Sequence, residues 1–200
     1  MCWAIFAQAQ EPAKNYDADT KTVSSTVLAL YDVISGGKDK PRDWDRFRNL
    51  FAPGARMVPT FKIGEKFSSM VLAAEDYVTK FGPGLLRDGF FEKEIGRKTD
   101  VYGPIAQVFS VYESRLKSKE EKPFAKGVNS IQLIFDGDRW WVQSISWADE
   151  ATAGPVPSFG ESGGDRSTVL PGRESYRASC SVPMVGEGLE DCEAVWLLAW

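Results

Sequence analysis

The chain has 200 residues, of which 43% are hydrophobic and 26% are charged, a composition typical of one globular domain with extensions. Collagen-like, coiled-coil and wholly disordered chains are thereby excluded. There are 24 Lys and Arg residues against 28 Asp and Glu, so no nucleic-acid partner is expected. With no histidine, Ser-His-Asp and Cys-His catalysis and the usual zinc sites are excluded. Acid–base chemistry is left to Asp, Glu, Lys, Tyr or Cys.

The N-terminus has an unusual composition. Residues 1–10 are apolar and then small, and Ala7-Gln8-Ala9 resembles a signal-peptidase site. A basic segment is missing, however, and the apolar core is shorter than in a working signal peptide. The segment is either the remnant of a longer signal, which implies an exported protein, or an incidental terminus of a soluble, cytoplasmic one. Residues 1–17 are expected to be disordered or signal-like.

Neither a disulfide framework nor a membrane partner is expected. Cys2, Cys180 and Cys192 lie outside the central part of the chain and match no CxxC spacing, so unpaired thiols are predicted. No apolar run approaches the roughly 18 residues that a membrane-crossing helix requires.

Two helices are predicted first. An apolar stripe with helical spacing consists of Val23, Val27, Leu30 and Ile34. This helix should begin near Thr20, with Asp17 or Asp19 as its cap, and end at Gly36-Gly37. A shorter helix should follow over residues 43–51, with Asp43 as its N-cap.

Strands dominate the rest of the domain. Residues 55–61 and 66–72 read as short strands, and residues 73–81 as a helix that Gly82-Pro83-Gly84 stops or kinks. Longer strands are predicted over 90–102, 105–116 and 126–135. The sequence Asp136-Gly137-Asp138 predicts a tight hairpin into a last strand that includes RWWVQSISW, because an Asp-Gly pair readily adopts positive φ angles.

This element order predicts an α+β fold with the helices on one face of a curved sheet. The domain should span residues 18–150. Residues 151–200 are rich in Gly, Pro and Ser and are predicted to form a low-complexity, mostly disordered tail.

Four segments carry a resemblance to a known family: LYDVISGG, DWDRFRNLFAPGARMV, FFEKEIGRKTDVYGPIAQVFSVYESR and GVNSIQLIFDGDRWWVQSISW. Together they resemble the NTF2-like superfamily, in particular its bacterial SnoaL-like members. The resemblance implies a strongly bent antiparallel or mixed sheet wrapped around a long N-terminal helix, with two shorter helices and a cone-shaped pocket. Members include isomerases, cyclases, dehydratases and many proteins of unknown activity, so fold does not settle function.

The catalytic residues of two enzyme types in this superfamily are missing. The isomerase-like members carry a basic Asp on the first strand, where this chain has Val58 or Pro59. The dehydratase members use a histidine with an acid, and this chain has no histidine. No recognisable catalytic constellation is therefore expected from the resemblance.

Glu92, Glu94 and Tyr112 remain as weak catalytic candidates. Glu92 and Glu94 are two residues apart on a strand and so share a face. If that face is concave, they could share a proton and act as acid and base. Lys93, Arg97 and Lys98 nearby favour the other alternative, in which both carboxylates face solvent and titrate normally.

A ligand pocket is predicted from residues at inward positions or on helix faces. They are Tyr31, Trp44, Tyr77, Tyr112, Asn129, Ser144 and Ser146. Ser144 and Ser146 would make room on a concave face, and Tyr112 could act as a hydrogen-bond donor to a ligand. Asp43 and Asp45 diverge on a helix and are read as N-terminal acids, so neither a metal nor a cofactor is expected.

Three functions stay open. The first is a non-catalytic domain that binds a small, apolar ligand in the cone or forms a homodimer. The second is a cofactor-independent lyase, isomerase or hydrolase that acts on a small carbonyl compound. The third is a purely structural interaction module whose cone is filled by its own side chains. The contents of the cone distinguish them.

Overall fold

The computed structural model describes residues 14–118 and 122–159. Its elements in chain order are a 3₁₀ helix η1 (Asp17–Thr20), α1 (Val23–Ile34), α2 (Trp44–Leu50), β1 (Phe51–Ile63), β2 (Lys66–Ser69), α3 (Ala74–Asp88), β3 (Phe91–Tyr102), β4 (Ile105–Arg115), β5 (Ala125–Phe135), β6 (Trp140–Asp149) and α4 (Glu150–Ala153). The predicted α+β class is confirmed. The three cysteines and most of both terminal segments lie outside the described residues.

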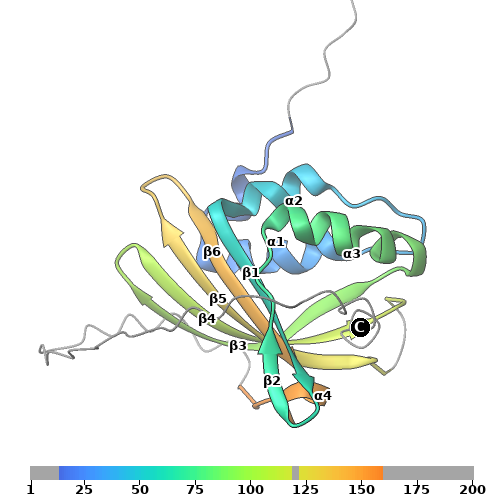
Figure 1. The fold of residues 1–200 in the computed structure, drawn as a ribbon. Coiled ribbons are helices and arrows are strands. Elements are labelled where there is room, and N and C mark those ends of the chain that lie inside the picture. Colours follow the sequence, from blue (N-terminus) through green and yellow to red (C-terminus); the bar gives the residue numbers. More distant parts are fainter. Residues whose placement is uncertain (1–13, 119–121, 160–200) are drawn as a thin grey trace, which may run out of the picture.

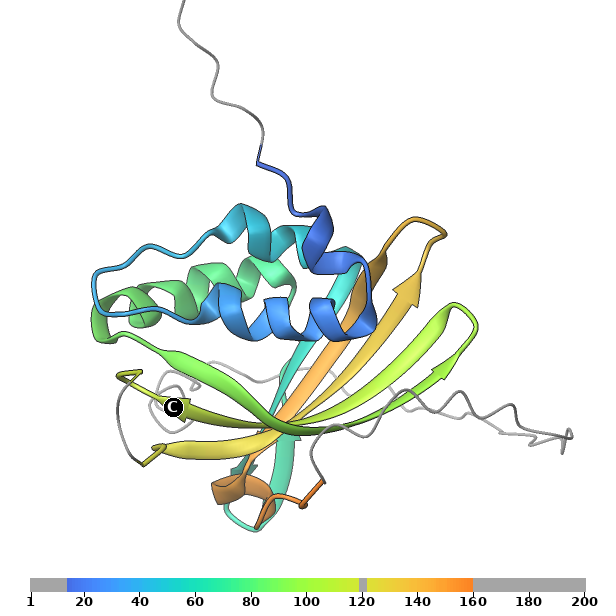
Figure 2. The same cartoon turned by 180° about the vertical axis from the view of Figure 1, so that it is seen from behind.

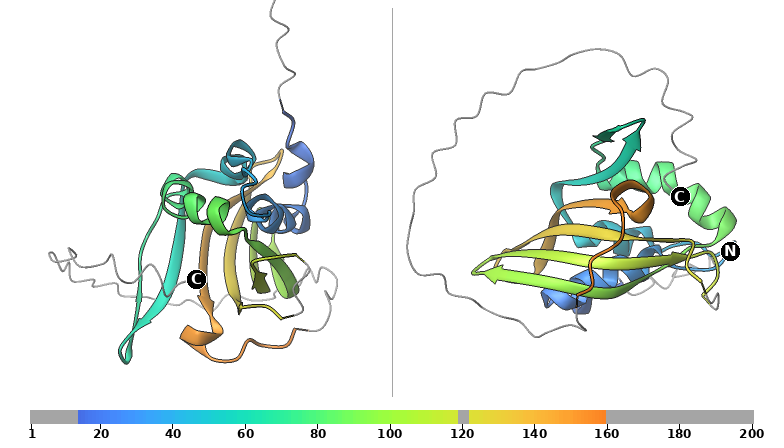
Figure 3. Two further views of the ribbon diagram at one scale, coloured as in Figure 1. Left: turned by 90° about the vertical axis from the view of Figure 1, so that its right-hand side faces the viewer. Right: turned by 90° about the horizontal axis from the view of Figure 1, so that it is seen from below.

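A single six-stranded sheet organises the fold, in the order β2-β1-β6-β5-β4-β3. β1 and β6 run parallel, and the other neighbouring strands pair antiparallel. The sheet is strongly curved, and α1, α2 and α3 lie together on one side of it (Figures 1 and 2). The views at right angles show the helices gathered over one end of the strands (Figure 3). The concave side of the sheet therefore faces the helices.

The start of α1 differs from the prediction. Its N-cap is Thr22, which forms a capping box with Ser25, and neither predicted aspartate caps it. Asp19 instead accepts a hydrogen bond of 2.7 Å from Nε of Arg46 on α2. A Thr with a hydroxyl-bearing residue three positions later satisfies two free N–H groups at once, and Asp19 is left to join η1 to α2.

Gly82-Pro83-Gly84 was predicted to stop or kink α3, and it does not stop it. The helix continues to Asp88 and ends at Gly89, whose φ is 77°. Tyr77, Phe81 and Leu85, spaced four residues apart, are all buried, so packing of this face outweighs the backbone hydrogen bond lost at proline. With 15 residues against 12, α3 is longer than α1, which corrects the expectation of a long first helix and two shorter ones.

A buried arginine joins the ends of two helices. The guanidinium of Arg42 donates to the carbonyl oxygens of Ile34 at 2.8 Å, Gly36 at 2.7 Å and Leu85 at 3.1 Å. These carbonyls lie at the C-terminal ends of α1 and α3, where the helix dipole favours a cation. Arg42 thus fixes α1 and α3 side by side without a carboxylate partner among the described residues.

Described structure continues beyond the predicted bounds of residues 18 and 150. Tyr16 donates hydrogen bonds to the Asp43 carboxylate, and η1 begins at Asp17, so ordered structure starts before residue 18. After residue 150, α4 forms with Asp149 as its N-cap, and the ring of Phe159 packs edge-on against Phe109 at 6.1 Å. Local capping and one aromatic contact extend the fold into a segment whose composition favours disorder. Residues 160–200 lie outside the described part.

Two glycines provide a matched test of the turn and helix assignments. Gly137 in the β5–β6 hairpin has a φ of 110°, whereas Gly84 lies inside α3, and a Cβ at either position would meet open space. Gly137→Ala should lower the free energy of unfolding by about 1–2 kcal/mol because L-residues disfavour positive φ. Gly84→Ala should raise it by about 0.5–1 kcal/mol. Urea denaturation measures both, and equal effects would contradict the assignments.

Candidate ligand pocket

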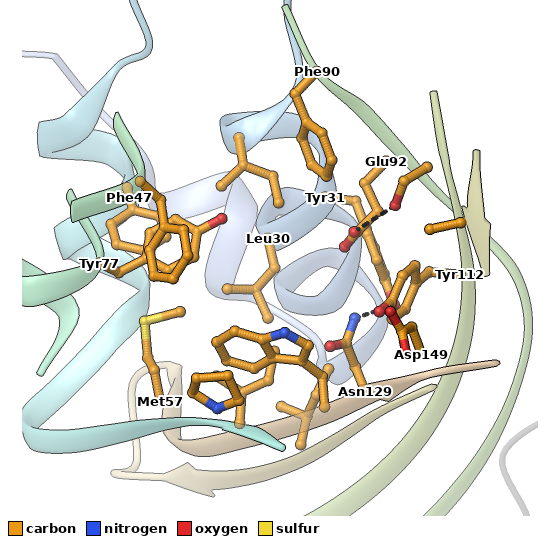
Figure 4. A pocket seen from close by; sticks show the side chains of 18 of the residues that line it. Leu30, Tyr31, Phe47, Met57, Tyr77, Phe90, Glu92, Tyr112, Asn129 and Asp149 are labelled. Atoms are coloured by element: carbon orange, nitrogen blue, oxygen red, sulfur yellow. Dashed lines mark hydrogen bonds between the residues drawn. The ribbon is translucent and has the colours of Figure 1, made fainter. Parts of the chain in front are cut away.

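A pocket lies between the helices and the concave side of the sheet, with a volume of about 90 Å³. Eight of its 19 lining residues are aromatic: Tyr31, Phe47, Tyr77, Phe81, Phe90, Tyr112, Phe124 and Trp147. Its polar residues are Glu92, Ser114, Asn129 and Asp149. In Figure 4, the labelled acids and Asn129 lie at one side of the pocket, and Phe47 and Tyr77 lie at the opposite side. The cone is therefore partly empty, and its polar groups are concentrated at one end.

Strand alternation decides which residues reach the pocket. On β6, Ile145, Trp147 and Asp149 line it, so Ser144 and Ser146 between them point to the other face of the sheet. Those two serines were predicted to line the pocket, and the structure does not place them there. Small residues alone did not reveal which face is concave, because the inward positions of β6 carry large side chains.

Trp44 was also expected in the pocket, and it does not line it. Its indole instead lies edge-on to the ring of Phe47 on the same helix, at 5.5 Å. A Cβ at Gly82 would lie 3.1 Å from the indole, so the glycine makes room for Trp44 against α3. Tyr31, Tyr77, Tyr112 and Asn129, by contrast, all line the pocket.

A chain of side-chain hydrogen bonds crosses from the sheet to α1. Ser110 Oγ donates to Glu94 Oε1 at 2.5 Å, and Tyr31 Oη lies 2.7 Å from Ser110 Oγ. Asn129 Nδ2 donates to Tyr31 Oη at 3.0 Å. These bonds satisfy buried polar groups from β3, β4, β5 and α1. They hold α1 at a fixed distance from the sheet, beside the pocket.

Glu92 supplies a carboxyl group to the pocket. Its backbone N–H donates to Ser35 Oγ at 3.0 Å, and Ser114 Oγ donates to its Oε2 at 3.0 Å. Burial raises the pKa of Glu92 to about 7, although hydrogen bonds from Ser114 and Asn129 favour the charged form. The expectation that this carboxylate faces solvent and titrates normally is therefore wrong, because its side chain turns inward among aromatic rings.

Glu94 shares the concave face with Glu92 but has a different environment. Its carboxylate pairs with Arg97 at 2.5 Å, and its side chain is only 12% exposed. It does not line the aromatic pocket. The two glutamates are thus not a pair that shares one proton: Glu94 is held by a cation, and Glu92 has none beside it in the pocket.

Two phenols face the pocket without hydrogen-bond partners. Tyr77 and Tyr112 are each 5% exposed, and neither hydroxyl makes a hydrogen bond within the described part of the chain. Burial, followed by the charge of Glu92, raises the pKa of both, so both remain hydrogen-bond donors at neutral pH. Gly127 lies opposite Tyr112 in the sheet, and a Cβ there would collide with the Tyr112 hydroxyl.

No group of three or more metal-ligating side chains occurs in residues 14–118 and 122–159, and no helix among them is long and apolar enough to cross a membrane. Asp43 caps α2 by accepting from the Arg46 N–H at 3.1 Å, and Asp45 pairs with Arg48. Both aspartates act as the sequence predicts.

Several lining residues were missed from the sequence. Asp149 lies at the end of β6, where it also caps α4, and Phe90 immediately precedes β3. Trp147 and Asp149 are two residues apart on β6 and so face the same side of the sheet. Placing one residue of this strand toward the pocket would have indicated both. Met57 and Pro59 on β1 also line the pocket, and only the parallel pairing of β1 with β6 brings them there.

The solved structures similar to this chain include NTF2-like proteins. One, of unknown function, is from Silicibacter pomeroyi, with 12% identity over 64% of this chain and 92% of that chain and a TM-score of 0.43. A superfamily protein from Salmonella enterica has 12% identity over 63% and 87%, with a TM-score of 0.45. A protein with a cystatin-like fold from Nostoc punctiforme has 11% identity over 64% and 93%, with a TM-score of 0.46.

Similarities of this degree say nothing about activity. No protein-family model matches the sequence, and no curated protein is significantly similar to it. The chemistry of this domain must therefore be argued from its own pocket.

Replacement of Glu92 should change how stability depends on pH. Its pKa rises from 4.5 in the unfolded chain to about 7 in the fold, so its contribution to stability is complete below about pH 4.5 and is lost as pH rises through about 7. Glu92→Gln, neutral throughout, should match the natural protein at pH 4 and exceed its free energy of unfolding by roughly 2–3 kcal/mol at pH 8.

Glu94→Gln on the same strand is the matched control. It removes the partner of a mostly buried Arg97 and should lower the free energy of unfolding at pH 8 by about 1 kcal/mol or more. Urea titrations between pH 4 and pH 8 measure both variants. Equal destabilisation by the two substitutions at pH 8 would contradict the assignment of Glu92 as an unpaired pocket carboxyl.

Proposed function

We propose that this domain binds a small, largely apolar molecule that carries one hydrogen-bonding group. The observation that carries the proposal is a partly empty aromatic pocket in which Glu92, Tyr77 and Tyr112 present polar atoms at the wall. Ligand pockets typically combine such an apolar lining with a few polar groups that orient the ligand. The cavity of about 90 Å³ favours a ligand of only a few carbon atoms.

A pocket-filling substitution tests ligand binding. Ala125 lines the pocket, and the next residue, Lys126, points to the opposite face of β5. We expect members of a panel of four-carbon alcohols, ketones and amines to bind the natural protein, detected by ligand-observed NMR. Ala125→Phe should abolish that binding, and Lys126→Phe should retain it. Melting curves confirm that both variants fold, and absence of binding by the natural protein would contradict the proposal.

Proton transfer is a second candidate function, and the pKa of Glu92 near 7 specifically favours it, since a general base works best when its pKa lies near the ambient pH. In this reaction, Glu92 would remove a proton from the carbon beside a carbonyl group, forming an enolate, and return a proton to the same carbon. Tyr112 would donate a hydrogen bond to the carbonyl oxygen as negative charge develops on it.

Hydrogen–deuterium exchange tests the catalytic candidate. With 2-butanone in D₂O, the natural protein should accelerate exchange of the protons beside the carbonyl group, as followed by proton NMR. Glu92→Gln should lower the protein-dependent rate at least 100-fold, and Tyr112→Phe should lower it by a smaller factor. No acceleration by the natural protein would refute proton transfer and leave binding as the function.

A further inference from the structure

The charged groups of the pocket all have the same sign. Glu92 and Asp149 are its two carboxyl-bearing residues, and no Lys or Arg lines it. Asp149 already accepts a hydrogen bond from the Thr152 N–H at 2.8 Å, whereas Glu92 has only its bond from Ser114 and the influence of Asn129. The pocket therefore lacks a positive counter-charge for Glu92.

The arginines around Glu92 pair with other carboxylates. Glu92 and Tyr31 also border a more open, polar hollow of about 680 Å³ between α1 and β3, which Arg46, Lys93 and Arg115 line as well. Arg46 pairs with Asp19 and Asp32, and Arg115 pairs with Glu113 at 2.5 Å. Arg97 is held by Glu94, and Lys93 is exposed. None of these cations lines the aromatic pocket.

Phenols face Glu92 from the other packed elements. Tyr31 on α1, Tyr77 on α3 and Tyr112 on β4 all have their pKa raised in part by the charge of Glu92. Each phenol therefore stays neutral and adds no charge of its own. The charge of Arg42 also acts on Tyr77 from the helix side, but its guanidinium is occupied by backbone carbonyls.

We infer that the ligand of this pocket is a small organic amine, bound as its ammonium ion with Glu92 as its counter-ion and the aromatic rings around its carbon atoms. The inference rests on the proposed binding function and names the class of ligand. An ammonium group pairs with a carboxylate, and aromatic faces attract cations, an effect that grows stronger away from water. The rings of Tyr77, Tyr112 and Trp147 are available in the lining for such contacts.

The other ligand classes fit this pocket less well. A carboxylate or phosphate ligand would meet Glu92 and Asp149 with no cation in the lining to offset the repulsion. A neutral alcohol or ketone can bond to the free phenols, but it leaves the charge of Glu92 unpaired in an apolar site, which is costly. An ammonium ion alone among these three classes both fills the apolar space and neutralises the carboxylate.

Three matched four-carbon probes test the inference: n-butylamine, 1-butanol and butyrate. Dissociation constants are measured at pH 8 from the chemical shift of the Trp147 indole N–H. An aliphatic amine, with a pKa near 10, is still charged at this pH. We expect n-butylamine to bind at least tenfold more tightly than 1-butanol, and butyrate not to bind. The affinity for n-butylamine should fall at least tenfold between pH 8 and pH 5.5, as Glu92 becomes protonated.

Two variants separate the counter-ion from the cavity. Glu92→Gln should lower the affinity for n-butylamine at least tenfold and change the affinity for 1-butanol less than threefold. Asp45→Asn, which removes an exposed acid on α2, should change neither. If 1-butanol or butyrate binds as tightly as n-butylamine, or if Glu92→Gln leaves the amine affinity unchanged, the inference is overturned and binding itself stands. If none of the three probes binds, the inference and the proposed function both fail.

Discussion

The hydrogen-bonded contact between Tyr31 and the sheet determines the rest of the site. Tyr31 projects from α1 onto Ser110 of β4 and Asn129 of β5, so the helix is held by buried polar atoms as well as by apolar packing. Because these partners are all mutually satisfied, the helix does not settle deeper into the cone. The space left between α1, α3 and the sheet is the aromatic pocket.

The same contact gives different surroundings to Glu92 and Glu94, which the sequence alone does not distinguish. Ser110 carries the hydrogen-bond chain on to Glu94, which Arg97 neutralises, so Glu94 belongs to the structural network. Glu92, two residues earlier, meets only Ser114 and Asn129. Its charge is costly in this environment, and that cost is what makes it responsive to pH and to a ligand of positive charge.

Much of the fold followed from the sequence, because helix stripes, the Asp-Gly turn and strand runs are local signals. The extension of α3 through Pro83 did not, because it depends on the burial of Leu85 by distant segments. In the site, Tyr31, Tyr77, Tyr112 and Asn129 were predicted from their aromatic or amide character and from their positions on helix faces or strands. Ser144, Ser146 and the environment of Glu92 were misjudged, since strand spacing shows which residues share a face but not which face is concave.

The pKa of the Glu92 carboxyl group tests the central claim most directly. Carbon-13 NMR of the side-chain carboxyl groups in the natural protein, assigned with Glu92→Gln, should show this group titrating near pH 7, well above the exposed glutamates. A titration of Glu92 near 4.5, the ordinary value for a glutamate, would show that the carboxylate is hydrated or paired. That result would contradict the account of an unpaired carboxyl in an aromatic pocket.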